Sequence, residues 1–321
     1  MRISGEKLLA EAEATGFHEE VLEKAILLLN LLDRFRSHPF LNKRLALKGG
    51  TALNLFFLKV PRLSVDIDLN YVGSADREIM LAERPKIEQA IQAVCSREHF
   101  SVRRVPTDHA GGKWILRYEK AAGQGGNLEV DVNFMFRVPL WPVKTLDSHF
   151  LGSYHASSIE VIDIHELAAG KLAALLARRQ ARDLFDAHQL LHFYRLDRQR
   201  LRLAFLVYGA MNRKDWRTVS NQDVGFDVED LARELLPLLC NPLPNNENSH
   251  EFGSRLVKEC QQALNAFFPF SNREIDFLNY LLDKGEIDPS LLTSDTDLQE
   301  RIKQHPLLEW KALNVRQHKG K

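Results

Sequence analysis

Two segments that alternate between apolar and polar residues constrain the fold of this chain most strongly. A period of two is the pattern of a β-strand that buries one face. In SVDIDLNYV the polar side carries Asp66, Asp68 and Asn70, and in NLEVDVNFMF it carries Glu129, Asp131 and Asn133. Each segment is therefore predicted to be a strand with one face in a core and an acidic face on a cleft or on solvent.

The remaining pattern predicts a mixed α/β sheet near the front of the chain and a helical region behind it. Helices are expected over residues 19–35, 51–58 and 84–94, and strands over 100–105, 114–119 and 128–137. After VPLWPVK the pattern becomes helical, and Asp163-x-x-Glu166 predicts a capping box at the start of the next helix. We place the sheet domain at 1–155 and the helical domain at 156–321.

The three aspartates of the two strands are predicted to converge if the strands are neighbours. Two carboxylates about 4 Å apart repel by roughly 4 kcal/mol at an effective dielectric constant near 20, and a domain is stable by only about 5–15 kcal/mol. A proton or a cation is therefore required among them. Oxygen donors with little histidine nearby favour magnesium or manganese over zinc. The alternative, a solvated sheet face, stays open on spacing alone.

A glycine pair precedes the first of these strands. Gly49 and Gly50 are predicted to begin a helix, where backbone amides bind an anion, and Thr51 adds a hydroxyl. Magnesium usually keeps part of its coordination shell for phosphate oxygens, so a nucleoside triphosphate is a natural co-ligand. The arrangement predicts phosphoryl or nucleotidyl transfer with two metal ions, and Asp131 as the candidate base. An ordinary loop is the competing interpretation of the GGT turn.

Two segments resemble a known family. KGGTALNL, followed by Arg62-x-Ser64 and by Asp66-Ile67-Asp68-Leu69, resembles the AbiEii/AbiGii-type nucleotidyltransferase toxins of the DNA polymerase β-like superfamily. KLAALLARRQARDLFDAHQL resembles that family's lysine helix and its arginine-aspartate-x-x-aspartate element. The resemblance implies a polymerase β-like nucleotidyltransferase core, followed by a mainly helical C-terminal domain that completes the active-site cleft. The interval from the glycines to Asp66 exceeds that of the wider superfamily but suits the toxin branch.

The resemblance also implies roles for the matching positions. Metal binding and catalysis are implied for Asp66 and Asp68, and Asp131 falls where the superfamily places a third carboxylate, with Glu129 as its rival on the same face. Lys171 matches the lysine that contacts the triphosphate, and Asp183 and Asp186 match the late acids that complete the catalytic set. The nucleotide-binding candidates are Gly49, Gly50, Thr51, Ser64, Lys171, Arg178 and Arg182. For Ser64, a structural hydroxyl at the start of the strand is the alternative.

Several basic and histidine residues have competing interpretations. Arg178, Arg179 and Arg182 either bind phosphates of a nucleotide or RNA, or form helix ion pairs of Arg178 with Asp186 or Arg179 with Asp183. His188 and His192 have a metal-compatible spacing, but no carboxylate stands one turn away, so we expect a helix-surface or packing role. The basic residues of the C-terminal tail, Lys311, Arg316, Lys319 and Lys321, either contact RNA or solubilise the terminus.

Composition limits the location and partners of the protein. Its 43 Lys and Arg balance 43 Asp and Glu, so an RNA partner requires a local basic patch. The N-terminus lacks the apolar centre of a signal peptide, no membrane span is predicted, and the three scattered cysteines suit a cytoplasmic protein.

The predicted function is transfer of nucleotides from an NTP to RNA, with the tRNA 3′ end as leading acceptor, by a toxin that blocks translation and arrests growth. The resemblance implies Mg²⁺ or Mn²⁺ as cofactor and a cognate antitoxin as partner. The alternatives are nucleotidylation of a protein or small molecule, and a catalytically silent binding module.

Overall fold

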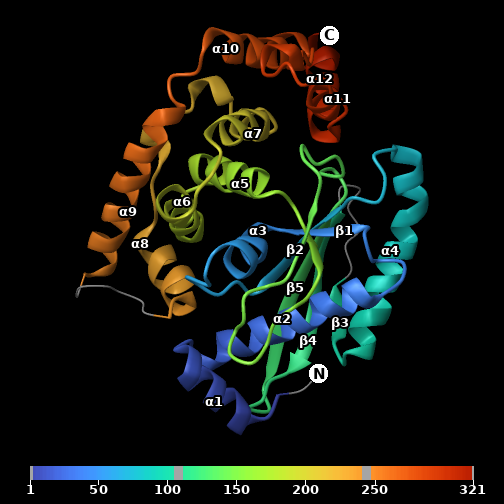
Figure 1. Ribbon diagram of the computed structural model, residues 1–321, viewed down its shortest axis with the longest axis vertical. Coiled ribbons are helices and arrows are strands. Elements are labelled where there is room, and N and C mark those ends of the chain that lie inside the picture. Colours follow the sequence, from blue (N-terminus) through green and yellow to red (C-terminus); the bar gives the residue numbers. More distant parts are fainter. Residues whose placement is uncertain (1–2, 105–110, 241–246, 320–321) are drawn as a thin grey trace. The chain divides into compact units, whose positions relative to one another are not determined.

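The computed structural model describes residues 3–104, 111–240 and 247–319 (Figure 1). Contacts within the chain define two compact units, each of which is described by itself. The first comprises residues 1–137, 143–162 and 237–242, and the second comprises residues 138–142, 163–236 and 243–321. Among the described helices, none is both long and apolar enough to cross a bilayer.

A mixed sheet of seven strands forms the centre of the first unit (Figure 1). The strands are β1 (Leu45–Lys48), β2 (Asp66–Tyr71), β3 (Ser101–Arg104), β4 (Gly111–Glu119), β5 (Gly125–Asn133), β6 (Lys144–Leu146) and β7 (Ile159–Val161). Their order is β3-β4-β5-β2-β1-β7-β6, with β2 antiparallel to β1 and parallel to β5. The two strands predicted from alternation are therefore adjacent at the centre of the sheet, and the predicted mixed α/β class is confirmed.

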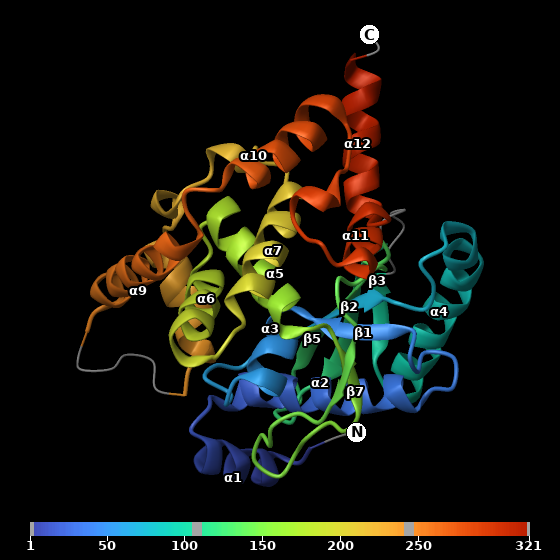
Figure 2. The ribbon, with the colours of Figure 1, turned by 45° about the horizontal axis from the view of Figure 1, so that its top comes forward.

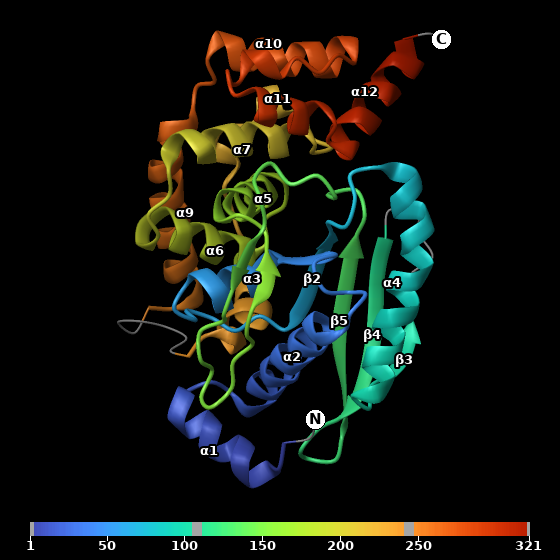
Figure 3. The same ribbon diagram turned by 45° about the vertical axis from the view of Figure 1, so that its right-hand side comes forward.

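One face of this sheet is the core of the first unit. Ile67, Val130 and Val132 are fully buried on it. Helices α2 (Glu19–Ser37) and α4 (Arg77–Arg97) cover this face (Figure 3), and the Tyr71 hydroxyl donates to Glu83 of α4 at 2.8 Å. Helix α1 (Gly5–Thr15) precedes them. Because the helices cover the apolar face, the acidic residues of β2 and β5 lie on the other one.

The connection from β1 to β2 begins with a short helix. Helix α3 (Gly49–Ala52) follows β1 directly and continues as one π-helical turn, Leu53–Phe57. The helix predicted over residues 51–58 is thus present, although its second half is wound more loosely than an α-helix. The predicted strand over 100–105 is observed up to Arg104, and Val105 lies outside the described residues.

The second unit is helical in its described part (Figure 2). Its helices are α5 (Ile164–Ala177), α6 (Ala181–Phe193), α7 (Arg198–Ala210), α8 (Val228–Asp230), α9 (Ser249–Leu264), α10 (Asn272–Asn279), α11 (Thr296–Lys303) and α12 (Pro306–Lys319). Short 3₁₀ and π turns join several of them. Leu172 of α5, Leu184 of α6 and Phe205 of α7 are fully buried, so this unit has an apolar core of its own.

The capping box predicted at the start of α5 is only half formed. Asp163 is the N-cap, and its carboxylate accepts from the His165 amide at 2.9 Å. Glu166 does not reach back to it. Its carboxylate instead accepts from the Trp141 amide at 3.1 Å and from the Tyr208 hydroxyl at 2.9 Å. Glu166 is buried, so tertiary partners replaced the local one.

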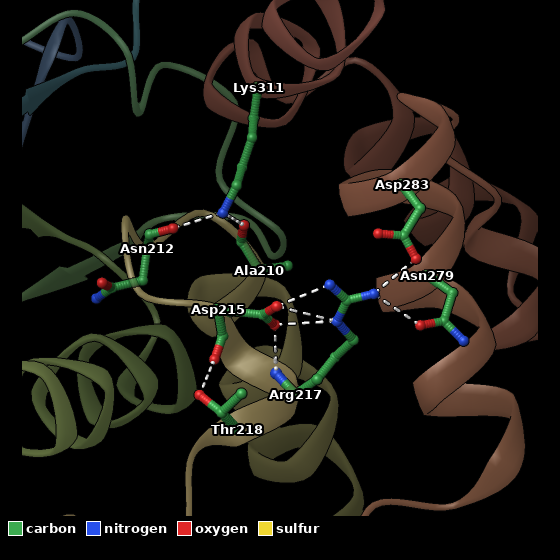
Figure 4. Close-up of polar contacts among 8 residues, drawn as sticks. All are labelled: Ala210, Asn212, Asp215, Arg217, Thr218, Asn279, Asp283 and Lys311. Carbon is green, nitrogen blue, oxygen red and sulfur yellow. Dashed lines mark hydrogen bonds and ion pairs between the residues drawn. The ribbon is translucent and has the colours of Figure 1, made fainter. Parts of the chain in front are cut away.

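A polar network holds the turn after α7 (Figure 4). The Arg217 guanidinium binds the Asp215 carboxylate at 2.7 Å and the Asp283 carboxylate at 2.7 Å. Lys311 of α12 donates to the carbonyl oxygens of Ala210 at 2.7 Å and Asn212 at 2.5 Å. Burial lowers the Lys311 pKa to about 8. From the sequence, Lys311 was expected to contact RNA or solvent. This prediction is wrong, because its ammonium is bound to backbone carbonyl oxygens within the helical unit. Of the other tail residues, Lys321 and the Lys319 side chain lie outside the described part of the chain.

Candidate active site

The strand register places the acidic residues of β2 and β5 opposite one another. Asp68 is the Cα partner of Asp131, and Asp66 is the partner of Glu129. Partners in neighbouring strands point to the same face about 5 Å apart. All four are partly buried. Two rows of paired carboxylates therefore cross the centre of the sheet.

Lysines flank the row formed by Asp68 and Asp131, called the inner row below; Asp66 and Glu129 form the outer row. Lys48 at the end of β1 is the partner of Asp68, and Lys113 of β4 is the partner of Asp131. The row thus reads Lys48, Asp68, Asp131, Lys113 across four strands. The Lys113 ammonium lies 2.6 Å from the Glu129 carboxylate, and this bond raises the pKa of Lys113. Glu129 consequently has a cation partner of its own.

The Asp131 carboxylate is partly buried beside other carboxylates, and a negative charge in such a place needs a positive partner. Burial raises the pKa of Asp131, and the neighbouring Asp68 and Glu129 raise it further, while Lys48 and Lys113 lower it. The net direction is upward, so the two lysines do not fully offset burial and like charge. Of the two rivals for the third carboxylate, Asp131 is the one directly opposite Asp68.

The glycine pair lies against the first acid of this row. A Cβ built on Gly49 would fall 2.2 Å from Oδ2 of Asp68, and Gly49 has a φ of +73° that favours glycine. The turn that the sequence proposes for phosphate binding therefore abuts the carboxylate proposed for metal binding. Only a residue without a side chain permits both this backbone conformation and this approach.

Buried polar side chains fix the turn in place. The Thr51 hydroxyl, which is fully buried, donates to the Asp66 carbonyl oxygen at 2.5 Å. The Asn54 amide donates to the Gly50 carbonyl oxygen at 2.9 Å. On the other side of Gly50, a Cβ would fall 3.0 Å from the Ser64 hydroxyl and 2.8 Å from the Arg62 guanidinium. Thr51 thus joins α3 to the first residue of β2.

The lysine and the late acids form a second cluster, within the helical unit. The Lys171 ammonium on α5 lies 3.2 Å from the Asp183 carboxylate and 2.8 Å from the Asp186 carboxylate on α6. Asp183 and Asp186 are three positions apart and share one helix face. Their side chains are 2% and 0% exposed, against 14% for Lys171, so the lysine reaches solvent more than the acids that hold it.

The arginines beside this cluster differ from the predicted ion pairs. Arg178 binds Asp183, with Nε 2.7 Å from its carboxylate, and not Asp186. The prediction of an Arg179–Asp183 pair assumed a continuous helix, and it fails because α5 ends at Ala177 and α6 begins at Ala181. Arg182 lies 3.7 Å from Glu234. Arg178 keeps 56% of its side chain exposed.

Sequence reasoning assigned no role to four residues that shape the first cluster. They are Lys48, Lys113, Asn54 and Arg62. Lys113 could have been found by extending the alternation of the strand backwards, since β4 begins at Gly111 and not near Trp114. Lys48 is the last residue before the glycine pair, but only the register of β1 with β2 reveals its acidic partner.

The central sheet, with paired carboxylates beside a glycine turn, has the arrangement that was expected from the sequence for nucleotidyl transfer. Comparison with solved structures agrees on the fold: MenT4, a nucleotidyltransferase toxin from Mycobacterium tuberculosis H37Rv, is similar with a TM-score of 0.50 and 17% sequence identity, over 96% of this chain and 99% of that one. No curated protein sequence gives a match.

The family model of the AbiEii toxin, described as a nucleotidyl transferase of a type IV toxin–antitoxin system, matches residues 30–271 of the 321. The chain therefore belongs to the AbiEii family, and the resemblance expected from the sequence is confirmed. It is a nucleotidyltransferase toxin of a type IV toxin–antitoxin system, with an NTP as substrate and an antitoxin as partner. The prediction of an enzyme, a nucleotidyltransferase, is confirmed.

Proposed function

We propose that this protein transfers a nucleotide from an NTP to the 3′ end of tRNA and releases pyrophosphate, in a reaction that depends on Mg²⁺ or Mn²⁺. The observation that carries the metal-dependent part is the register that sets Asp68 opposite Asp131 with Gly49 against Asp68. The acceptor, and the consequent block of translation, follow from the resemblance. A cytoplasmic location belongs to the same proposal, since NTP and tRNA are found there.

The residues of the inner and outer rows suit a hard divalent cation. Asp66, Asp68 and Asp131 offer carboxylate oxygens, the donors that Mg²⁺ prefers. The raised pKa of Asp131 supports this fit, because a cation would relieve the burial and like charge that raise it. When bound, such an ion supplies Lewis-acid stabilisation of the charge that develops on the phosphate and its leaving group.

The other residues of the first unit bind, orient and move a proton. The Gly49 and Gly50 amides bind phosphate oxygens, and Lys48, beside Asp68 in the register, adds positive charge. Asp131 accepts the proton of the attacking hydroxyl, since it lies directly opposite Asp68 in the register and need not coordinate both metal ions. Thr51 and Ser64 position this turn, given that both side chains are buried beside it.

In the helical unit, Lys171 contacts the triphosphate and its neighbours hold it. A lysine offers phosphate a compact charge on a flexible stem. Asp183 and Asp186 bind its ammonium from a buried position, so we assign them as positioning residues for Lys171. Arg178 and Arg182 add charge for phosphates of the nucleotide or the RNA, and Arg178 is the more exposed of the two.

The test is transfer of label from α-³²P NTPs, each of the four in turn, to total RNA, protein and small molecules of a cell extract. The variants are Asp68→Asn, which keeps the shape of the side chain, and Asp297→Asn, an exposed acid of α11 that serves as the matched control. We expect label in tRNA with the intact chain and with Asp297→Asn, and a loss of roughly 100-fold or more with Asp68→Asn, since metal stabilisation contributes several kcal/mol.

Two results would contradict the proposal in different ways. Label in protein or in a small molecule, with the RNA unlabelled, would refute the acceptor and leave the site intact. Undiminished labelling of tRNA by Asp68→Asn would refute the assignment of the site while leaving the acceptor correct.

A further inference from the structure

A second cluster of metal-ligating side chains lies in the helical unit, apart from the residues assigned above. His188 and His192 of α6 meet Glu259 of α9, and one ligand atom from each of the three lies within 4.8 Å of the others. From the sequence alone, a helix-surface or packing role was expected for the two histidines, because no carboxylate stood one turn away. The structure supplies the carboxylate from a helix that lies far along the chain.

The cluster is fixed on one side and open on the other. His188 is 4% exposed, and its Nε2 lies 2.5 Å from the Glu259 carboxylate. The rings of His188 and His192 stack with centroids 4.5 Å apart. His192 is exposed and Glu259 is intermediate. Solvent can therefore reach the cluster, and water is available as a further ligand.

The hydrogen bond that His192 makes through Nδ1 leaves its other ring nitrogen available to bind a cation. Its Nδ1 lies 3.1 Å from the His188 carbonyl oxygen, which can only accept, so Nδ1 carries the proton. In the neutral ring, Nε2 then has the free lone pair. A backbone carbonyl that orients the far nitrogen in this way is the usual support of a metal-bound histidine.

An ordinary packing role explains less of this arrangement. A hydrogen-bonded pair of His188 and Glu259 accounts for their contact, and Arg255 adds a weaker contact to Glu259 at 3.7 Å. That pair does not require His192. It also leaves His188 Nδ1 buried without a hydrogen-bond partner among the described residues. Such a group is costly in a stable fold unless the site has another use.

We propose that His188, His192 and Glu259 form a binding site for Zn²⁺ that links α6 to α9. Two imidazoles and one carboxylate suit Zn²⁺, which takes nitrogen and oxygen ligands and accepts water in its fourth position. The all-oxygen donors of Asp66, Asp68 and Asp131 suit Mg²⁺ instead, so the two sites differ in ligand chemistry. The ion would fasten the helix that carries Asp183 and Asp186 to its neighbour, and this structural role is independent of the proposed acceptor.

The test uses the full chain with Asp66→Asn and Asp68→Asn as background, in excess Mg²⁺, so that Zn²⁺ binding at the carboxylate rows is suppressed. In this buffer, Zn²⁺ is titrated calorimetrically into the background protein. The same titration is made on three variants that carry His192→Ala, Glu259→Gln or His250→Ala in addition. His250 is an exposed histidine of α9 outside the cluster, and it is the matched control. Because His192 is exposed, its replacement preserves the core.

We expect one equivalent of Zn²⁺ to bind the background protein and the His250→Ala control and to raise their Tm. His192→Ala and Glu259→Gln should each weaken binding by at least about 10–100-fold, the loss that outer-shell groups alone produce. X-ray absorption at the zinc edge should show two imidazoles at about 2.0–2.1 Å. Binding that His192→Ala leaves unchanged, or a shell of oxygen atoms only, would overturn the proposal. So would the lack of any stoichiometric binding.

Discussion

The contact between Gly49 and Asp68 predicts how a single methyl group should affect the enzyme. In Gly49→Ala the new Cβ would lie 2.2 Å from Oδ2 of Asp68, where ordinary contact begins at 3.4 Å. The carboxylate is the end of a side chain and can yield, so it should move by about 1 Å. A misplacement of that size costs an active site roughly 100-fold in rate.

The stability cost of Gly49→Ala should be much smaller than its cost in rate. A φ of +73° strains alanine by about 1–2 kcal/mol, and the reduced entropy of the unfolded chain returns about 0.4–1 kcal/mol. Gly123→Ala is the matched control, because Gly123 has a φ of +82° and nothing lies within 4 Å of its Cβ position. The two variants share the backbone strain and differ in the collision with Asp68.

Equilibrium unfolding in guanidinium chloride and steady-state nucleotidyl transfer separate the two effects. Both variants should lose stability by a similar amount of about 1 kcal/mol. Only Gly49→Ala should lose activity, by roughly 100-fold, at conditions where circular dichroism shows it folded. Equal activity of the two folded variants would refute the reasoning, since it would mean that the position of the Asp68 carboxylate does not matter.

Two other predictions concern the helical unit. Lys171→Met should destabilise the protein by about 3–5 kcal/mol, because it removes the ammonium bound to buried Asp183 and Asp186. Arg178→Ala, at an exposed side chain, should cost less than about 1 kcal/mol. Chemical denaturation measures both losses of stability, and equal losses would contradict the burial argument. Burial raises the pKa of Glu166 from 4.5 to about 7, so the folded protein keeps a proton that the unfolded chain releases, and stability should fall by up to about 3 kcal/mol as the pH rises through this window. Glu166→Gln should remove that part of the decline, and an identical pH profile in the variant would show that another group causes it.

In the first unit, the strands whose position follows from a single residue pattern were predictable from the sequence. Alternation located β2 and β5 and their acidic faces, since side-chain direction in a strand follows directly from a period of two. The parallel pairing and its register were not readable, because they depend on strands that meet only in the folded chain. That register is what sets Asp68 opposite Asp131 and leaves Glu129 with Lys113.

Predictions based on sequence neighbours failed where tertiary partners were available. Glu166 was expected to cap its own helix, but it is buried against Tyr208 and Trp141. Arg178 binds Asp183 across a helix break that the pattern did not show. A carboxylate for the two histidines was sought one turn away, and Glu259 provides it from another helix. In each case the partner lies too far along the chain, or beyond a break, for local spacing to reveal it.

We propose that carboxylates of β2 and β5 together hold a divalent ion with the triphosphate. Electron paramagnetic resonance of Mn²⁺, titrated into the protein with a non-hydrolysable NTP analogue, measures this directly. Asp68→Asn and Asp131→Asn should each weaken Mn²⁺ binding strongly, while Glu129→Gln, whose carboxylate is bound to Lys113, should bind nearly as the intact chain does. Mn²⁺ binding that persists unchanged in Asp68→Asn would contradict the account.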